Sequence, residues 1–326
     1  MNDKCVLLIV DDDPIAQMTL QALLGGGQYR LEFASSGGEG IGKASAVNPD
    51  LILLDVMLPG IDGFEVCRRI RSDSRLAEVP VMLVTSLEDR ESRLRGFEAG
   101  AEYFVSKPYD ALELQTRVHT VTQLNRYRRL QEQLEKTIDL TLESFVRALG
   151  QRHKESEEHT RHLMVITLKL ARRMKYPESE MGHLRRGVQM HDLGKIGIPD
   201  AIHLKRGPLT PAQMDKMRTH PQLVFDMFKD IDFLKPALEI AYCHHEKWDG
   251  SGYPRGLKGG YIPYSARMFA IVDVWEALST DRHYRPSDRR KWPASEVHAY
   301  LKEQSGIHFD PQFVEPFIEL LIEEHL

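Results

Sequence analysis

The sequence predicts a multidomain protein in which a doubly wound α/β domain is followed by a helical connector and a second domain with different chemistry. Three observations support this fold class. The chain has 326 residues, which exceeds the usual size of a single domain. Short apolar runs alternate with helix-like stretches in its first third. All fourteen histidines lie at or after His119, so the two parts of the chain differ in composition.

The alternation in the first third predicts a parallel sheet. Each apolar run is short, is separated from the next by a helix-like stretch and ends in polar residues, which is typical of strands covered by helices on both faces. The predicted strands are Val6–Val10, Leu51–Leu54, Val79–Val84 and Tyr103–Val105, and the clearest predicted helices are Pro14–Leu24 and Gly63–Arg71.

A set of polar side chains follows these strands directly. The residues are Asp11, Asp12, Asp55, Thr85 and Lys107. Because the carboxyl ends of parallel strands open into one crevice, we expect the five side chains to share a site. Three neighbouring carboxylates repel one another unless a hard divalent cation such as Mg²⁺ lies among them. The hydroxyl and the ammonium would then neutralise a phosphoryl group on one carboxylate. The alternative is that these are ordinary loop acids of such a fold.

Over roughly residues 3–122 the chain resembles the receiver domain of two-component systems, which has a flavodoxin-like fold, and we place this domain at residues 1–122. The resemblance implies a cognate sensor histidine kinase as partner. Phe104 stands at the position of the family's switch aromatic residue, although the adjacent Tyr103 blurs this assignment. The implied roles are Mg²⁺ binding for Asp11 and Asp12, phosphoryl acceptance for Asp55, and contact with the phosphoryl group for Thr85 and Lys107.

Residues 123–142 are predicted to form a helical linker. Between Asp110 and Gly150 the chain has no glycine or proline, and its apolar residues recur at steps of three and four, which places them on one face of a helix. A face of this kind suits a coiled coil, so we expect a homodimer through the linker. The alternative is a helix that packs within its own chain. The apolar residues are Val118, Val121, Leu124, Tyr127, Leu130, Leu134 and Ile138.

The second part of the chain, residues 143–326, carries metal-ligand residue types in separate segments. Glu155 and His159 are four residues apart, so both project from one face of a predicted helix. Imidazoles and carboxylates without clustered thiols suit iron, manganese, zinc or nickel. Eight candidates exceed what one tetrahedral site uses, and two or three neighbouring metal ions suit the hydrolysis of phosphate esters. The candidates are Glu155, His159, His191, Asp192, His220, His244, His245 and Asp273.

The most specific signal is the run from His244 to Pro254, which reads His-His-Glu-Lys-Trp-Asp-Gly-Ser-Gly-Tyr-Pro. Together with the pair His191-Asp192 it resembles the HD-GYP domain over about residues 143–321. The resemblance implies an all-α fold and hydrolysis of cyclic di-GMP to pGpG and/or GMP. It also implies that the eight candidates hold two or three divalent ions, with Fe, Mn or Ni as the expected metals. The other implied roles are catalysis for Lys195 and Asp192, phosphate binding for Arg282 and Arg285, and shaping of the substrate pocket for Tyr253.

Three positions depart from the pattern of the HD-GYP family. His162 stands where Arg is common, Val224 replaces a usual Gly, and Glu276 replaces a usual Asp. None of these changes removes a predicted ligand, but the extra methylene of Glu276 puts a proton-transfer role there in doubt. The simpler interpretation of His162 is a helix-face histidine without a metal role. Cys243, although it precedes His244, is expected to be a small buried residue.

We therefore expect phosphorylation-regulated hydrolysis of cyclic di-GMP in a two-component pathway. The alternatives are a catalytically weak sensor of a cyclic dinucleotide, an adaptor for diguanylate cyclases with GGDEF domains, and a hydrolase of another cyclic dinucleotide. The net charge of −5 and the lack of a helix-turn-helix pattern argue against DNA binding. No apolar run approaches the roughly 20 residues that span a bilayer, and the N-terminus does not resemble a signal peptide. Three scattered cysteines suit reduced thiols, so we expect a cytoplasmic protein with no membrane partner.

Overall fold

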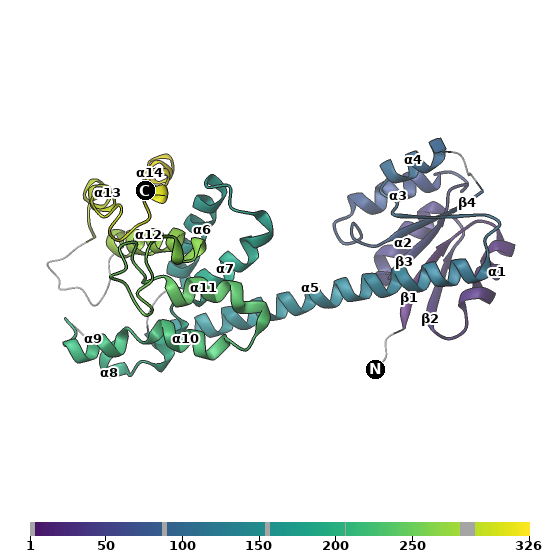
Figure 1. The fold of residues 1–326 in the computed structure, drawn as a ribbon. Coiled ribbons are helices and arrows are strands. Elements are labelled where there is room, and N and C mark those ends of the chain that lie inside the picture. The colour runs from purple at the N-terminus through teal and green to yellow at the C-terminus, as the bar shows by residue number, and fades with distance from the viewer. Residues whose placement is uncertain (1–3, 87–89, 154–156, 206, 281–290) are drawn as a thin grey trace. The chain divides into compact units, whose positions relative to one another are not determined.

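The chain forms two compact units, Met1–Glu135 and Lys136–Leu326. Figure 1 draws the first unit as a sheet with helices on its faces and the second as a bundle of helices. No helix in the described part of the chain is both long enough and apolar enough to cross a membrane. The side chains of residues 152, 153 and 157–159 are not described. The residues described by the computed structural model are 4–86, 90–153, 157–205, 207–280 and 291–326.

The first unit is built on a five-stranded parallel sheet with the strand order β2-β1-β3-β4-β5. β3 and β4 are buried along their whole length, which explains their unbroken apolar sequences. The strand order reverses at β1, so the carboxyl ends of β1 and β3 border an open crevice. The strands are β1 (Cys5–Val10), β2 (Tyr29–Ala34), β3 (Leu51–Asp55), β4 (Val81–Thr85) and β5 (Tyr103–Ser106).

Helices cover both faces of this sheet. One apolar core lies between the sheet and α2 and α3 and includes Ala44 and Phe64. The other lies between the sheet and α1 and α5 and includes Leu20 and Leu114. The doubly wound α/β fold predicted from the sequence is confirmed. The helices are α1 (Pro14–Leu24), α2 (Gly37–Val47), α3 (Gly63–Ser72), α4 (Arg90–Glu98) and α5 (Ala111–His153).

Two strands differ from the sequence prediction. β2 was not predicted, because Arg30 and Glu32 interrupt its apolar residues and only Ala34 in it is buried. β4 begins after Pro80 rather than at Val79, since a proline has no N–H to donate to the sheet.

The predicted connector is part of one helix of 43 residues, α5, which contributes residues to both units. Val118 and Val121 are buried in the core of the first unit, and Leu142 and Leu149 are buried in the second. The helix therefore packs within its own chain at both ends. Between these ends lies an apolar face whose side chains are 54–69% exposed, namely Leu124, Tyr127, Leu130 and Leu134. A coiled coil needs an exposed apolar face, and among the predicted positions this middle part of α5 provides it.

Polar side chains also fasten α5 to the first unit. Asn125 Nδ2 donates to the Asp50 carbonyl at 2.8 Å, and Arg129 Nη1 lies 2.9 Å from the Asp50 carboxylate. Arg128 Nη1 lies 3.0 Å from the Glu78 carboxylate. Asp50 precedes β3 and Glu78 precedes β4, so these contacts lie at the end of the sheet opposite to its carboxyl-end crevice.

The second unit is all-α in its described residues, as expected, apart from an isolated bridge between Ser305 and Phe309. Several of its helices carry proline in the first turn, where the missing N–H costs no hydrogen bond. Its α-helices are α6 (Glu157–Arg173), α7 (Met181–Met190), α8 (Asp200–His203), α9 (Pro211–Met217), α10 (His220–Phe228), α11 (Lys235–Cys243), α12 (Tyr264–Ser279), α13 (Ala294–Glu303) and α14 (Pro311–Glu323).

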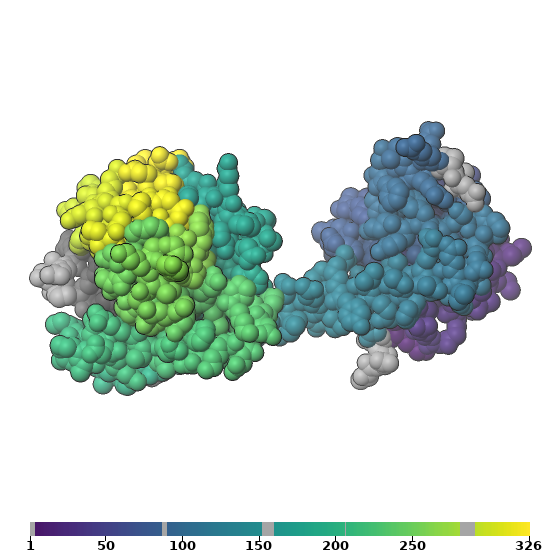
Figure 2. All heavy atoms as spheres, viewed as in Figure 1, coloured from purple at the N-terminus to yellow at the C-terminus, as the bar shows by residue number. Residues whose placement is uncertain are grey.

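Two apolar cores hold the second unit together. The larger joins α6, α7, α12, α13 and α14 around Phe269, Trp275 and Phe317. In Figure 2 the last two helices, coloured yellow, lie against the green middle of this unit. The smaller core joins the end of α5 to α7, α10 and α11 through Leu142 and Leu149. Both cores contain residues of α7 and α11, and the histidine motifs of the sequence follow the last residues of these two helices.

Candidate functional site

The polar cluster predicted for the first unit lies at the carboxyl ends of its strands. Lys107 Nζ is 2.8 Å from Asp11 Oδ2 and 2.8 Å from Asp55 Oδ2, and both carboxylates are buried. One oxygen each from Asp11, Asp12 and Asp55 lie within 4.8 Å of one another. Thr85 ends β4, the strand paired with β3, and is also buried. The structure thus brings the five predicted side chains to one crevice.

The charges of this cluster suit a cation and a phosphoryl group together. Burial lowers the pKa of Lys107, but its hydrogen bonds to Asp11 and Asp55 outweigh that effect and raise the pKa, so the ammonium persists at neutral pH. The Met57 N–H donates to Asp55 Oδ1 at 3.1 Å, and the Asp13 N–H donates to Asp11 Oδ1 at 2.9 Å. Backbone amides therefore orient two of three carboxylates, and oxygen ligands of this kind fit Mg²⁺.

Phe104 and Tyr103 lie on opposite faces of β5. Phe104 packs against the core formed with α2 and α3, and its ring centre is 4.7 Å from that of Phe97 in α4. Tyr103 packs against the other core, on the side of α1 and α5. Arg117 of α5 donates to the Phe104 carbonyl at 2.8 Å. The two rings therefore face different helices, and it is Phe104 that contacts α4. Its role as a switch residue stays a prediction.

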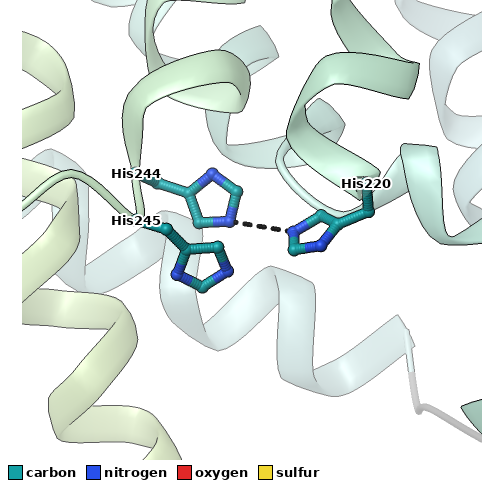
Figure 3. A group of neighbouring side chains, drawn as sticks. All are labelled: His220, His244 and His245. Carbon is teal, nitrogen blue, oxygen red and sulfur yellow. Dashed lines mark hydrogen bonds between the residues drawn. The ribbon is translucent and has the colours of Figure 1, made fainter. Parts of the chain in front are cut away.

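In the second unit, three helix ends bring five predicted ligands together. His191 and Asp192 follow the last residue of α7, His220 begins α10, and His244 and His245 follow the last residue of α11. Figure 3 shows His220, His244 and His245 turned toward one another. The cluster depends on the packing of α7, α10 and α11.

Three of the histidines are fixed by the same kind of backbone contact. Nδ1 of His191, His220 and His244 donates to the carbonyl oxygen three residues earlier, at 2.7, 2.9 and 3.1 Å respectively. A carbonyl oxygen only accepts, so Nδ1 carries the hydrogen, and wherever the ring is neutral its Nε2 presents a lone pair. Histidines that bind a metal ion through Nε2 commonly have such an anchor on Nδ1.

The Nε2 atoms face one another and a carboxylate. His220 Nε2 and His244 Nε2 are 3.4 Å apart, and one nitrogen each from His220, His244 and His245 lie within 4.8 Å (Figure 3). His191 Nε2 is buried and makes no hydrogen bond within the described part of the chain, although Asp192 Oδ2 lies 3.1 Å away. Facing lone pairs in a buried site are unfavourable unless a cation lies between them. These residues therefore fit divalent metal ions, which bind deprotonated ligands.

Burial keeps most of these imidazoles neutral. It lowers the pKa of His244 to about 3, with a further contribution from His220 and His191, and it also lowers the pKa of His220 and His245. His191 differs, because the negative charge of Asp192 outweighs burial and raises its pKa to about 9. Asp192 therefore attracts positive charge to this point, whether the charge is a proton on His191 or a metal ion.

Asp192 is the centre of the charge network. Its Oδ2 is 2.6 Å from Lys195 Nζ, and its Oδ1 is 3.5 Å from His220 Nε2. Burial raises the pKa of Asp192, but Lys195 and His191 hold it well below its usual range. Asp273 of α12 is half-buried, and its charge also raises the pKa of His191. The sixth described ligand candidate thus acts on the same cluster from a fourth helix.

The loop after His245 folds back onto this cluster. The Tyr253 N–H donates to the His245 carbonyl at 3.1 Å, and the two rings are 4.8 Å apart. Glu246 is buried and accepts from the backbone N–H of Arg255 at 2.7 Å, which closes the loop. Burial raises the pKa of Tyr253 above its usual range, so its phenol keeps its proton beside the metal ligands.

Two family models match the chain. The response regulator receiver domain matches residues 7–119, and the HD domain matches residues 132–313, more than half of the chain. The chain belongs to the response regulators that join a receiver domain to an HD domain. The match to the HD domain implies divalent metal ions, and the histidine cluster fits them.

Relatives with this arrangement match almost the whole chain. A "Probable cyclic di-GMP phosphodiesterase" of Vibrio cholerae is 34% identical over 98% of this chain and 78% of its own length. The cyclic di-GMP phosphodiesterase response regulator RpfG of Xanthomonas campestris is 30% identical over 96% of this chain and 86% of its own. A cyclic di-GMP phosphodiesterase of Thermotoga maritima is 31% identical over 96% of this chain and 90% of its own.

Some predicted residues of the HD domain have no described geometry. Glu155, Arg282 and Arg285 lie outside the described residues. His159 lies in α6, but its side chain is not described. The expected metal ligands Glu155 and His159 and the expected phosphate-binding arginines therefore stay predictions.

Arg218 is a cation near the HD site that motif reasoning missed. Its guanidinium carbon lies 5.5 Å from the centre of the Tyr253 ring. The side chain is 53% exposed, so it is open to a ligand. Arg218 stands two residues before His220 and belongs to none of the quoted motifs. A basic residue so close in sequence to a ligand histidine is the signal that could have identified it.

The departures from the family pattern have structural partners. His162 Nδ1 donates to Glu276 Oε2 at 3.0 Å, so two of the three departures contact each other. Val224 is fully buried where α10 meets the turn that contains Gly194, and a Cβ at Gly194 would lie 2.9 Å from the Val224 backbone nitrogen. The turn and α10 thus approach each other so closely that position 194 needs glycine, whereas position 224 accepts valine. Cys243 is buried, and burial raises its pKa to about 11, which confirms a small buried residue.

Proposed function

We propose that the HD domain hydrolyses cyclic di-GMP to pGpG and/or GMP with two or three divalent metal ions, Fe, Mn or Ni. The observation that carries this proposal is the convergence of three anchored histidines. Nε2 of His191 and of His220 lies against Asp192, which also contacts Lys195, and Nε2 of His244 lies against that of His220. The names of the relatives supply the substrate. The proposed ligands are Glu155, His159, His191, Asp192, His220, His244, His245 and Asp273.

The chemistry divides between the metal ions and the side chains around them. Bound ions of this kind supply an activated water and neutralise charge on the phosphate. Lys195, held 2.6 Å from Asp192, places an ammonium beside the ligands, where it stabilises negative charge that develops on a phosphate oxygen. Tyr253 keeps its proton and can donate a hydrogen bond to the dinucleotide. Arg218 adds a charged donor over Tyr253, and phosphate oxygens are strong acceptors for guanidinium groups.

The test of this proposal compares cyclic dinucleotides. Metal-loaded full-length protein is incubated with cyclic di-GMP, 3′3′-cGAMP or cyclic di-AMP, and the products are separated by chromatography. We expect conversion of cyclic di-GMP to pGpG or GMP at the highest rate, and none with His244→Ala. Faster hydrolysis of another dinucleotide would reassign the substrate. Binding of cyclic di-GMP without product would make the domain a sensor.

Regulation belongs to the same proposal. A sensor histidine kinase phosphorylates Asp55 in the presence of Mg²⁺ bound by Asp11 and Asp12, and the new charge changes turnover in the HD domain. Lys107 supports this role, because it already bridges Asp11 and Asp55 and can share its protons with a phosphoryl group. Thr85, at the end of the neighbouring strand, offers a hydroxyl to the same group.

Helix α5 is the proposed route between the two domains. Its residues Leu142 and Leu149 are buried in the core formed with α7, α10 and α11. That core contains residues close in sequence to three ligands: Met190 directly before His191, Val224 four residues after His220 and Ala241 three residues before His244. A rotation of α5 would therefore shift the backbone that carries these ligands, even though no α5 side chain needs to enter the metal site.

The exposed middle of α5 suits a second copy of the chain. Leu124, Tyr127, Leu130 and Leu134 form one apolar face there, and a homodimer through this face would couple two receiver domains to two HD domains. Turnover and molar mass are measured for protein without and with the phosphoryl mimic beryllofluoride, and for Asp55→Asn. We expect the mimic to raise turnover, and equal rates in all three samples would refute regulation through Asp55.

A further inference from the structure

His162 and Glu276 connect two helices that carry predicted metal ligands. His162 lies on α6, three residues after His159, and Glu276 lies on α12, three residues after Asp273. Residues three apart are neighbours on one face of a helix. The contact between His162 and Glu276 therefore lies one helical turn away from the two ligand positions.

The contact is direct, and its glutamate side is shielded from water. His162 Nδ1 donates to Glu276 Oε2 at 3.0 Å. Glu276 is 2% exposed, whereas the His162 side chain is 38% exposed. The His162 ring also lies 5.5 Å from the ring of Trp275, which packs edge-on against Phe317 in the main core of the domain. A buried carboxylate is costly unless hydrogen bonds or charges compensate it, and the hydrogen bond from His162 supplies part of this compensation.

We propose that His162 and Glu276 form a positioning pair that sets how α6 and α12 lie against each other and thereby holds Asp273 of α12 and His159 of α6 in place for the metal ions. The inference rests on the proposed metal site of the HD domain. Neither residue binds substrate or metal in this proposal. Both act through the backbone of the helix turn that each shares with a ligand.

The lengths of the two side chains give the proposal its sharpest consequence. Histidine is shorter than arginine, and glutamate is longer than aspartate. The variant His162→Arg therefore lengthens the side chain from α6 while the side chain of Glu276 on α12 keeps its length. Replacing Glu276 with aspartate shortens the other side by one methylene and leaves a gap. The double change His162→Arg with Glu276→Asp restores the combined reach of the pair. The two single variants should therefore be impaired, and the double variant should recover.

The experiment uses the full-length protein and three measurements: metal ions retained per chain, kcat and KM for cyclic di-GMP, and the thermal midpoint. Residues that orient metal ligands typically change metal affinity or activity by about 10- to 100-fold when they are altered. We expect His162→Arg and Glu276→Asp each to lower kcat about 10-fold with loss of bound metal, and the double variant to return within about 2-fold of the original chain. Glu276→Gln keeps the acceptor oxygen and should retain most of the activity.

Lys169→Ala is the matched control. Lys169 lies on α6, as His162 does, but it pairs with Glu324, which directly follows α14, a helix without a proposed ligand. Its loss should therefore leave metal content and kcat unchanged. If the decrease in kcat of the double variant equals the product of the two single decreases, the two residues act independently and the proposed pair is refuted. So would an inactive Glu276→Gln, because Glu276 would then act in the chemistry itself. If the original chain binds metal without hydrolysing cyclic di-GMP, the proposed function fails, and metal content alone still decides the role of the pair.

Discussion

Leu142→Ala tests whether α5 acts on the metal site through the small core of the HD domain. Leu142 is 2% exposed and packs with residues of α7, α10 and α11. Truncating a buried leucine to alanine costs about 2–5 kcal/mol, because transfer free energy is lost and a cavity remains. In a unit of this size each kcal/mol lowers the thermal midpoint by about 2–4 °C, so we expect a fall of about 10 °C.

The decisive quantity is the ratio of turnover with and without beryllofluoride. If α5 reaches the ligands through this core, Leu142→Ala should bring the ratio close to one, because the cavity absorbs the movement of the helix. Leu140→Ala is the matched control on the same helix, since Leu140 is 54% exposed. Its truncation should change the stability by less than about 0.5 kcal/mol and leave the ratio intact.

The assay is steady-state hydrolysis of cyclic di-GMP below the thermal midpoint of each variant, with circular dichroism as the check on folding. A folded Leu142→Ala protein that keeps the full ratio would refute the route through this core. An equal loss in Leu140→Ala would refute it too, because exposed α5 residues would then transmit as much as buried ones.

Three further predictions concern single side chains of the HD domain. His191→Ala should lose metal and turnover while Asp55 still accepts a phosphoryl group, as elemental analysis and phosphate-affinity electrophoresis would show; near-normal metal content would mean that the metal site is assigned wrongly. Glu155→Ala should lower bound metal by about one ion per chain, whereas Glu157→Ala should not, and identical metal counts would leave a two-metal site. Arg218→Ala should raise KM about 10-fold with little change in kcat, because a charge-assisted contact contributes about 1.5–3 kcal/mol; unchanged kinetic constants would exclude contact with substrate.

The receiver domain was the more predictable half of the molecule, and for a physical reason. Its strands are apolar runs, and its site residues follow those runs directly, so strand ends alone place Asp11, Asp55 and Lys107 together. The strand that escaped prediction is β2, in which Arg30 and Glu32 replace part of the apolar pattern. An edge strand buries less surface, and its sequence therefore carries a weaker signal.

The HD cluster was predictable by residue type but not by geometry. The histidines are visible in the sequence, whereas the carbonyl oxygens that fix His191, His220 and His244 have no sequence signature, because every residue has a carbonyl. The contact between His162 and Glu276 was equally hidden, since it depends on how α6 packs against α12. Each residue was noticed singly as a departure, but only the fold brings the two together.

The charge network around α7 also limits how α5 can transmit a signal. Arg186 Nε of α7 lies 2.5 Å from Asp139 of α5, its side chain is only 8% exposed, and its guanidinium carbon lies 4.5 Å from the centre of the Phe233 ring. Sliding α5 by one turn, about 5.4 Å, would break both hydrogen bonds between Arg186 and Asp139, each a charge-assisted contact of about 1.5–3 kcal/mol. Coupling between sites typically amounts to about 1–3 kcal/mol, which is too little for that displacement. A small rotation that keeps Asp139 on Arg186 and moves Leu142 and Leu149 against the backbone of the ligands fits within this limit.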